Sequence, residues 1–131
     1  MAGYSGTPLH KKLGIRPGLR AFVRGAPESL AAELAPLAAR TKLAAPLDYV
    51  HVFVTEQADL AALFPKIDKA LVDDGVVWIS WPKKAAKVPT TVDEGEVRRL
   101  GLQTSLVDVK VCAVDVVWSG LKFMRRRENR G

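Results

Sequence analysis

The sequence is poor in cysteine and has no long apolar run. Cys112 is the single cysteine among 131 residues, which excludes an internal disulfide and favours a reducing compartment. No apolar run reaches the roughly 18 residues that a transmembrane helix needs. The N-terminal segment MAGYSGTPLHKKLG lacks the apolar core of a signal peptide. We therefore expect a single domain over residues 1–131, located in the cytoplasm.

Several motifs with known chemistry are also missing. There is no GxGxxG dinucleotide turn and no GxxxxGK[ST] phosphate loop. His10 and His51 have no Cys or His partner at ligand spacing, so no metal site is predicted. Nothing around Ser119 matches a nucleophile elbow. His51 lies on the strand face of Tyr49 and Phe53, which favours a hydrogen-bonded core histidine over a catalyst. These absences argue against an enzyme.

Basic side chains outnumber acidic ones. The chain has 20 Lys and Arg against 14 Asp and Glu, a formal net charge of +6. The basic residues gather in three segments, at 11–24, 83–87 and 122–130. This distribution predicts an anionic partner, either nucleic acid or a small phosphate-bearing molecule. The tail at 125–131 could contact nucleic acid or simply aid solubility, and no recognition helix or aromatic-interleaved basic strand supports the first reading.

The alternation of strand and helix patterns predicts an α/β sandwich. Strands are expected at 20–25, 41–44, 49–55, 76–81, 106–115 and 118–126, after a lead-in over 1–18. The segments YVHVFVT and VVWISW are rich in β-branched and aromatic residues with few polar breaks, as in parallel strands buried on both faces. The last two strands are separated by a short turn, which predicts an antiparallel hairpin.

Helices are expected between these strands. Leucine spacing after the first strand predicts a helix that Pro36 shortens or kinks. An apolar stripe predicts a longer helix over 60–71, closed by Gly75. Thr91 and Glu94 match a capping box and predict the start of the last helix. Helices would then cover both faces of a mainly parallel sheet.

Several segments of the sequence resemble those of two known protein families. KLGIRPGLRAFVRGAP and DDGVVWISWPKK resemble the first strand and a later helix–turn–strand step of the Rossmann-like methyltransferases. That resemblance implies a three-layer sandwich with strand order 2-1-3-4-6-5 and one antiparallel strand. The segments YSGTPL, SWPKKA and WSGLKF resemble an uncharacterised bacterial domain-of-unknown-function family, for which no activity is implied.

The sequence departs from the methyltransferase pattern where a cofactor would bind. The turn after the first strand reads AFVRGAPES, with one glycine, Gly25, and with Arg24 where that superfamily has an acid. The segment TKLAAP should end in an acidic residue that holds a ribose diol, but it ends in alanine and proline. No cofactor is therefore predicted. A degenerate S-adenosylmethionine-dependent group-transfer enzyme remains the alternative.

The candidate binding site is the edge where the parallel strands end, because open sheets bind ligands there. The residues expected at this rim are Glu56, Trp81, Lys83, Lys84, Asp115 and Trp118. Lysine ammoniums suit phosphate or carboxylate, and a tryptophan face suits a base or cation. Tyr4 and Ser5, with Gly6 and Thr7, could fold over the rim as a lid or form a plain cap.

The alternative to a binding site is a purely structural role, in which the lysines belong to a solvated loop and Trp81 only covers the end of the sheet. On the binding interpretation, the domain is non-catalytic or regulatory and binds an anionic small molecule or a protein partner at the rim.

Overall fold

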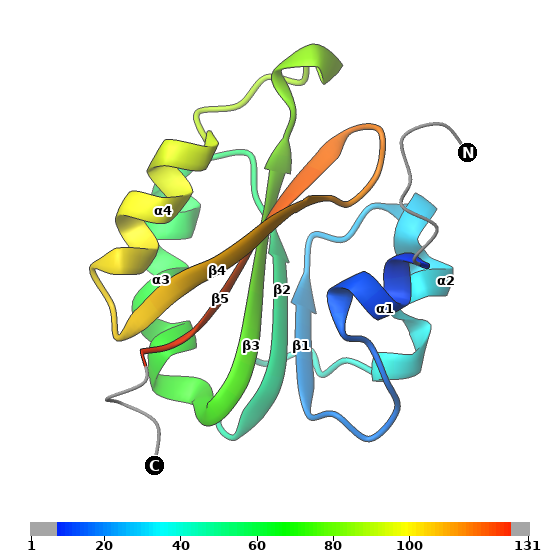
Figure 1. Cartoon of the computed structure of the whole chain (residues 1–131), viewed down its shortest axis with the longest axis vertical. Coiled ribbons are helices and arrows are strands. Elements are labelled where there is room, and N and C mark those ends of the chain that lie inside the picture. The colour runs from blue at the N-terminus through cyan, green and yellow to red at the C-terminus, as the bar shows by residue number, and fades with distance from the viewer. Residues whose placement is uncertain (1–7, 127–131) are drawn as a thin grey trace.

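The computed structural model describes residues 8–126. Its elements are α1 (Leu9–Leu13), β1 (Ala21–Arg24), η1 (Glu28–Leu30), α2 (Ala31–Leu34), η2 (Ala35–Leu37), β2 (Leu47–Phe53), α3 (Gln57–Ala70), β3 (Leu71–Pro82), η3 (Lys84–Ala86), α4 (Glu94–Leu102), β4 (Leu106–Ala113) and β5 (Trp118–Arg125). Figure 1 shows α3 and α4 on one side of the sheet and α1 and α2 on the other. Within the described part of the chain, no helix is long and apolar enough to cross a membrane.

The sheet has five strands in the order β1-β2-β3-β5-β4. β1 pairs with β2 and β2 with β3 in parallel, whereas β5 pairs antiparallel with both β3 and β4. The prediction of the C-terminal hairpin is confirmed, and the sheet is mixed rather than mainly parallel. The expected strand at 41–44 does not form. The predicted six-strand order 2-1-3-4-6-5 was therefore wrong in including that strand. Arg40 instead makes one isolated parallel bridge to Phe22, on the outer edge of β1.

β2 and residues 77–82 of β3 are buried on both faces, as their sequences predicted. Alternate residues point to opposite faces of a strand. On β3, Ile79 joins the core beneath α3 and α4, while Trp78 joins the core beneath α1 and α2. Trp78 is fully buried, and its indole Nε1 donates to the main-chain oxygen of Leu13 over 3.0 Å. The lead-in therefore holds a short helix that packs on the sheet, which the sequence pattern did not reveal.

The core histidine is confirmed. His51 is fully buried, its Nε2 lies 2.8 Å from Ser80 Oγ, and its ring stacks on Phe53 with centroids 4.2 Å apart. Its Nδ1 lies 3.4 Å from the Tyr49 hydroxyl. Burial lowers the pKa of His51 from 6.5 to about 3, so the ring is neutral at ordinary pH. A neutral, inaccessible imidazole is a packing element, not a catalytic base.

α3 ends earlier than predicted, and a side chain from a distant strand donates hydrogen bonds to main-chain oxygens at its C-terminal end. The helix stops at Ala70 and Leu71 already belongs to β3, so Gly75 does not close it. The last carbonyls of a helix lack partners within the helix. Here the guanidinium of Arg125 donates to the main-chain oxygens of Asp68 and Leu71. It also pairs with the Asp68 carboxylate over 2.8 Å. Arg125 thus lies in β5 and is not part of an exposed tail.

α4 begins two residues later than the predicted capping box. Asp93 is the N-cap, and its Oδ1 accepts from the main-chain N–H of Glu96 over 2.9 Å. Thr91 serves a different helix, because its Oγ1 accepts from the main-chain N–H of Gln57 at the start of α3. The predicted helix exists, but its cap was assigned to the wrong residue. The helical stretch that contains Pro36 is short, as expected, and it consists of a short α-helix between two 3-10 turns.

Replacing Arg125 with lysine tests the link between α3 and β5. Lysine keeps the charge but cannot donate at the same time to a carboxylate and to two carbonyls, because its donors radiate from one atom. We expect Arg125→Lys to lower the free energy of unfolding by about 2 kcal/mol, measured by urea denaturation. Arg126→Lys is the matched control, because Arg126 makes one long contact of 3.4 Å to the Leu102 oxygen. Equal losses in both variants would contradict this assignment.

The neutral core histidine should make the fold sensitive to acid. Its pKa is lower in the folded chain than in the unfolded chain, so the unfolded state binds more protons below about pH 6.5. The free energy of unfolding should therefore fall by an additional ~1.4 kcal/mol per pH unit between about pH 6 and about pH 3. We expect His51→Gln to remove this component in urea denaturation at about pH 7, 5.5 and 4.5. Parallel pH curves for the two proteins would refute it.

Candidate functional site

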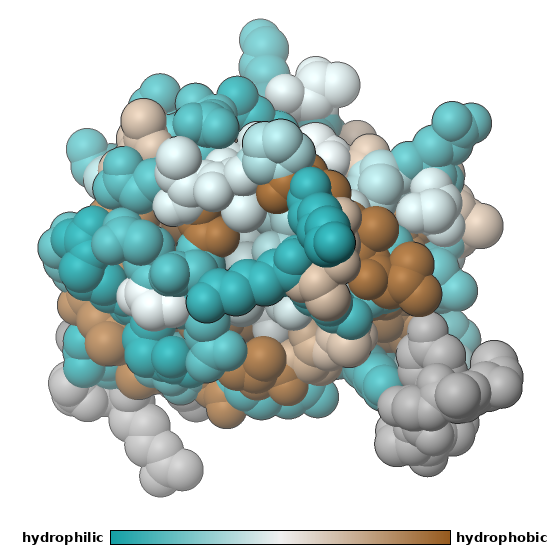
Figure 2. Space-filling model, turned by 90° about the horizontal axis from the view of Figure 1, so that it is seen from above, coloured by the Kyte–Doolittle hydropathy of each residue, from teal (hydrophilic) through white to brown (hydrophobic). Residues whose placement is uncertain are grey.

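A pocket opens where β3 leaves the sheet. It has a volume of about 600 Å³ and is lined by Trp81, Pro82, Lys83, Lys84, Thr90, Thr91, Val92, Asp93, Glu94, Gly95 and Ser119. Figure 2 looks onto the face above the strand ends, where hydrophilic residues predominate around smaller apolar areas. We call this cavity the β3-exit pocket. It contains three of the residues expected at the rim: Trp81, Lys83 and Lys84.

Main-chain and hydroxyl hydrogen bonds fix the walls of this pocket. Thr90 Oγ1 donates to the Thr55 oxygen over 2.7 Å and accepts from the Val92 N–H. The Thr91 N–H donates to the same Thr55 oxygen. These bonds tie the loop before α4 to the segment that follows β2. The opposite wall is anchored as well, because the Lys83 N–H donates to the Val117 oxygen over 2.8 Å.

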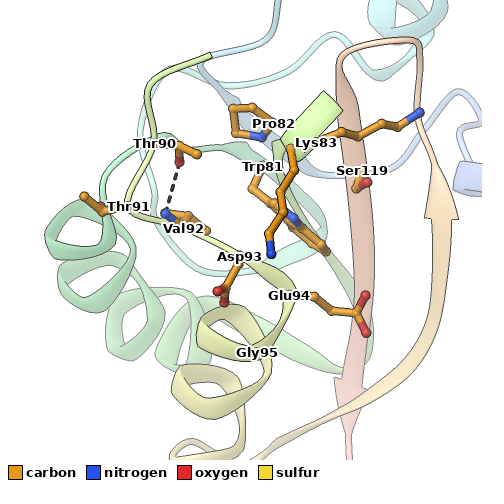
Figure 3. A pocket seen from close by; sticks show the side chains of 11 residues that line it. Trp81, Pro82, Lys83, Thr90, Thr91, Val92, Asp93, Glu94, Gly95 and Ser119 are labelled. Carbon is orange, nitrogen blue, oxygen red and sulfur yellow. Dashed lines mark hydrogen bonds between the residues drawn. The ribbon is translucent and has the colours of Figure 1, made fainter. Parts of the chain in front are cut away.

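The pocket carries charges of both signs. Among the described residues, Lys83 and Lys84 have no carboxylate within ion-pair distance. Glu94 pairs with Arg98 over 3.0 Å, and Asp93 is engaged as the helix cap. Figure 3 shows the side chains of both acids on the side of the pocket formed by the start of α4. Among the described residues that line the pocket, Lys83, Lys84 and Asp93 carry charges that no ion pair neutralises.

Trp81 forms the floor of the pocket. Its side chain belongs to the core under α3 and α4 and is only 5% exposed. A ring that is this buried supports the cavity and presents little face for stacking. Ser119 lies on the neighbouring strand directly opposite Trp81, so its hydroxyl points to the same side of the sheet.

The other expected rim residues lie elsewhere. Asp115 folds the β4–β5 turn, because its Oδ1 accepts from the N–H groups of Val117 and Trp118 over 2.8 and 2.7 Å. Trp118 packs edge-on against Phe53, in the core under α1 and α2. Glu56 is exposed at the N-cap of α3 and makes no capping bond there. Neither Asp115, Trp118 nor Glu56 lines the β3-exit pocket. Tyr4 and Ser5, with the rest of the expected lid, lie outside the described residues.

Sequence reasoning missed the far wall of the pocket. Thr90, Thr91 and Asp93 come from the loop that precedes α4, and Ser119 comes from β5. The run PTTVDE carried a signal, since it places two hydroxyls and two carboxylates at a helix start shortly after the lysines. The pattern predicts a capping box, but it does not show that this loop packs against β3.

The end of β1 does not fit S-adenosylmethionine. Gly25, with φ of 75°, lies so close to β2 that a Cβ there would be 2.7 Å from the Phe53 oxygen. The glycine of this turn is thus used for packing between two strands. The segment TKLAAP, which should end in the acid that holds a ribose diol, ends in alanine and proline and forms no strand. The residues present supply neither a glycine-rich cradle nor the acid.

No protein-family model matches this sequence. No curated protein matches it either. The predicted resemblance to an uncharacterised bacterial family therefore stays a prediction.

Solved structures do match the fold. A TehB-like SAM-dependent methyltransferase from Corynebacterium glutamicum aligns with a TM-score of 0.58 and 11% identity, over 95% of this chain and 91% of that one. Magnesium protoporphyrin IX methyltransferase from Synechocystis PCC 6803, solved with bound SAM, aligns with a TM-score of 0.60 and 12% identity, over 89% and 74% of the two chains. A methyltransferase from Pyrococcus furiosus gives 0.57 and 11%, over 88% and 79%.

At these identities the likeness shows the fold alone. The chain has a Rossmann-like α/β fold of the methyltransferase type, with a five-stranded mixed sheet.

Proposed function

We propose that this domain binds an anionic small molecule in the β3-exit pocket and does not transfer a methyl group. The observation that carries the proposal is the pair of lysines, Lys83 and Lys84, which line a preformed cavity and, among the described residues, have no carboxylate partner. Two lysines that make no ion pair can attract an anion to their side of the pocket, and ammonium groups bind phosphate or carboxylate as point charges.

The shape of the pocket supports a small molecule over a protein partner. Its volume of about 600 Å³ falls in the range of about 300–1,000 Å³ that is usual for small-molecule sites. The hydrogen-bonded loop from Thr90 to Val92 keeps the cavity open without a partner. Asp93 and Glu94 would repel an anion on the α4 side. The anionic group should therefore lie on the β3 side, near the two lysines and the Ser119 hydroxyl.

The fold comparisons favour a second candidate, a degenerate S-adenosylmethionine-dependent group-transfer enzyme. Its support is the likeness to methyltransferases over most of the chain, including one solved with SAM. The turn at Gly25 and the end of the segment TKLAAP argue against it, because neither offers the groups that hold this cofactor. The two candidates differ in what they bind, so separate titrations distinguish them.

Binding at the two lysines can be tested with Lys83→Ala/Lys84→Ala. The probes are sodium pyrophosphate and sodium citrate, titrated into ¹⁵N-labelled protein. In the unaltered protein we expect saturable shifts at the Trp81 indole N–H, with the Trp78 indole N–H as the unshifted internal reference. The double variant should bind at least about tenfold more weakly, because each ammonium contributes a charge-assisted contact.

The matched control is Lys66→Ala/Lys69→Ala, which removes the same charge from the exposed surface of α3. It should bind like the unaltered protein. Equal weakening in both double variants would mean that net charge, rather than the pocket, attracts the anion.

Calorimetry with S-adenosylmethionine tests the second candidate. We expect no saturable heat at ligand concentrations up to about 1 mM, which corresponds to a binding free energy weaker than about −4 kcal/mol. Saturable binding in the micromolar range would overturn the proposal in favour of a group-transfer enzyme. The competence of the protein sample is checked by its pyrophosphate titration in the same buffer.

A further inference from the structure

Two lysines face each other on the side of the sheet opposite the β3-exit pocket. Lys122 of β5 pairs in register with Trp78 of β3 on one side and with Lys110 of β4 on the other. Residues directly opposite each other on neighbouring strands point to the same face. Trp78 lies beneath α1, where it bonds to Leu13. Trp78, Lys122 and Lys110 therefore lie side by side on one face of the sheet, on the neighbouring strands β3, β5 and β4.

This arrangement is unfavourable for the isolated domain. Like charges placed directly opposite each other destabilise an antiparallel pair. Burial lowers the pKa of Lys122, and the nearby Lys110 ammonium lowers it further. The ladder is irregular here, since the register shifts between Asp108 and Lys110. Natural proteins tolerate such local conflicts mainly where function requires them.

Further cations gather around this pair. Burial raises the pKa of the half-buried Cys112 thiol, while Lys110 and Lys12 oppose that rise, so both ammoniums lie near the sulfur. Arg16 and Lys122 also line one small cavity of about 120 Å³. We call the group of Lys12, Arg16, Lys110 and Lys122 the hairpin-face cluster. Asp48 and Asp74 line the same small cavity. Asp48 is held by Arg20 over 2.8 Å, which lowers its pKa to about 2.

We propose that the hairpin-face cluster binds the phosphate backbone of nucleic acid. Its cations come from α1, the loop after α1, β4 and β5, so they are spread over a face and do not converge in one deep pocket. An extended polyanion can contact such a surface at several points, whereas a single small anion cannot. A phosphate between Lys110 and Lys122 would also relieve their repulsion. This site lies on the other side of the sheet from the β3-exit pocket, so it does not depend on the proposed function.

The test is fluorescence anisotropy with a 5′-fluorescein-labelled oligodeoxythymidine of about 20 nucleotides, a length that exceeds typical single-strand sites. We expect dissociation constants of about 1–100 µM that rise steeply with salt, because bound phosphates release counterions. Lys110→Gln should weaken binding roughly eightfold at about 50 mM NaCl and flatten the log–log salt slope by about 0.7, the contribution of one contact to a single strand. Without DNA, the same variant should raise the urea midpoint, since it removes the repulsion.

Lys69→Gln is the control, because Lys69 is exposed on α3. It should change neither the binding nor the urea midpoint. Cys112 is a built-in reporter, and saturating oligonucleotide should slow its reaction with a thiol reagent. The proposal is overturned if Lys110→Gln binds like the unaltered protein, or if Lys83→Ala/Lys84→Ala loses the binding instead. It is also overturned if sodium pyrophosphate protects Cys112 while the oligonucleotide does not.

Discussion

Burial of β2 and β3 on both faces is the constraint on which the rest of the structure depends. Because Trp78 and Ile79 point to opposite sides of one strand and neither can face water, each side of the sheet needs its own helical layer. Together α3 and α4 form one layer, and α1 and α2 form the other (Figure 1). With both faces of the central strands covered, the charged side chains of the sheet lie near the strand ends and on β4 and β5. Both proposed binding sites lie in those places.

Much of the fold was predictable because apolar periodicity reports burial directly. β2, β3 and the β4–β5 hairpin follow from runs of two-sided or alternating apolar residues. The errors occurred where a distant residue decides a local outcome. Arg125 satisfies the end of α3 from a strand more than fifty positions away, so the local signal at Gly75 had no role. Thr91 is used by α3, which leaves Asp93 to cap α4. No pattern within one segment contains that information.

The candidate site was predicted in part for a related reason. Trp81, Lys83 and Lys84 follow one strand, and their position at its exit could be inferred from the sequence. Asp115 and Trp118 were grouped with them because all lie near strand ends. A sheet end has two sides, however, and alternation sends Ser119 toward the pocket while Trp118 packs on Phe53 under the other helical layer. The choice of side depends on hairpin register, which Asp115 sets through its turn.

The glycine after β1 has a different neighbour here from the one it has in a nucleotide-binding turn of this type of fold. Where the turn after β1 approaches a nucleotide closely, glycine makes room for the ligand. Here Gly25 makes room for the main-chain oxygen of Phe53. The space beside this glycine is therefore filled by β2 of the same chain. Cations outside that turn then become the places where a negatively charged ligand can gain energy. The Lys110–Lys122 pair extends this reasoning, because a charge repulsion that weakens the free domain becomes an attraction once a phosphate lies between its members.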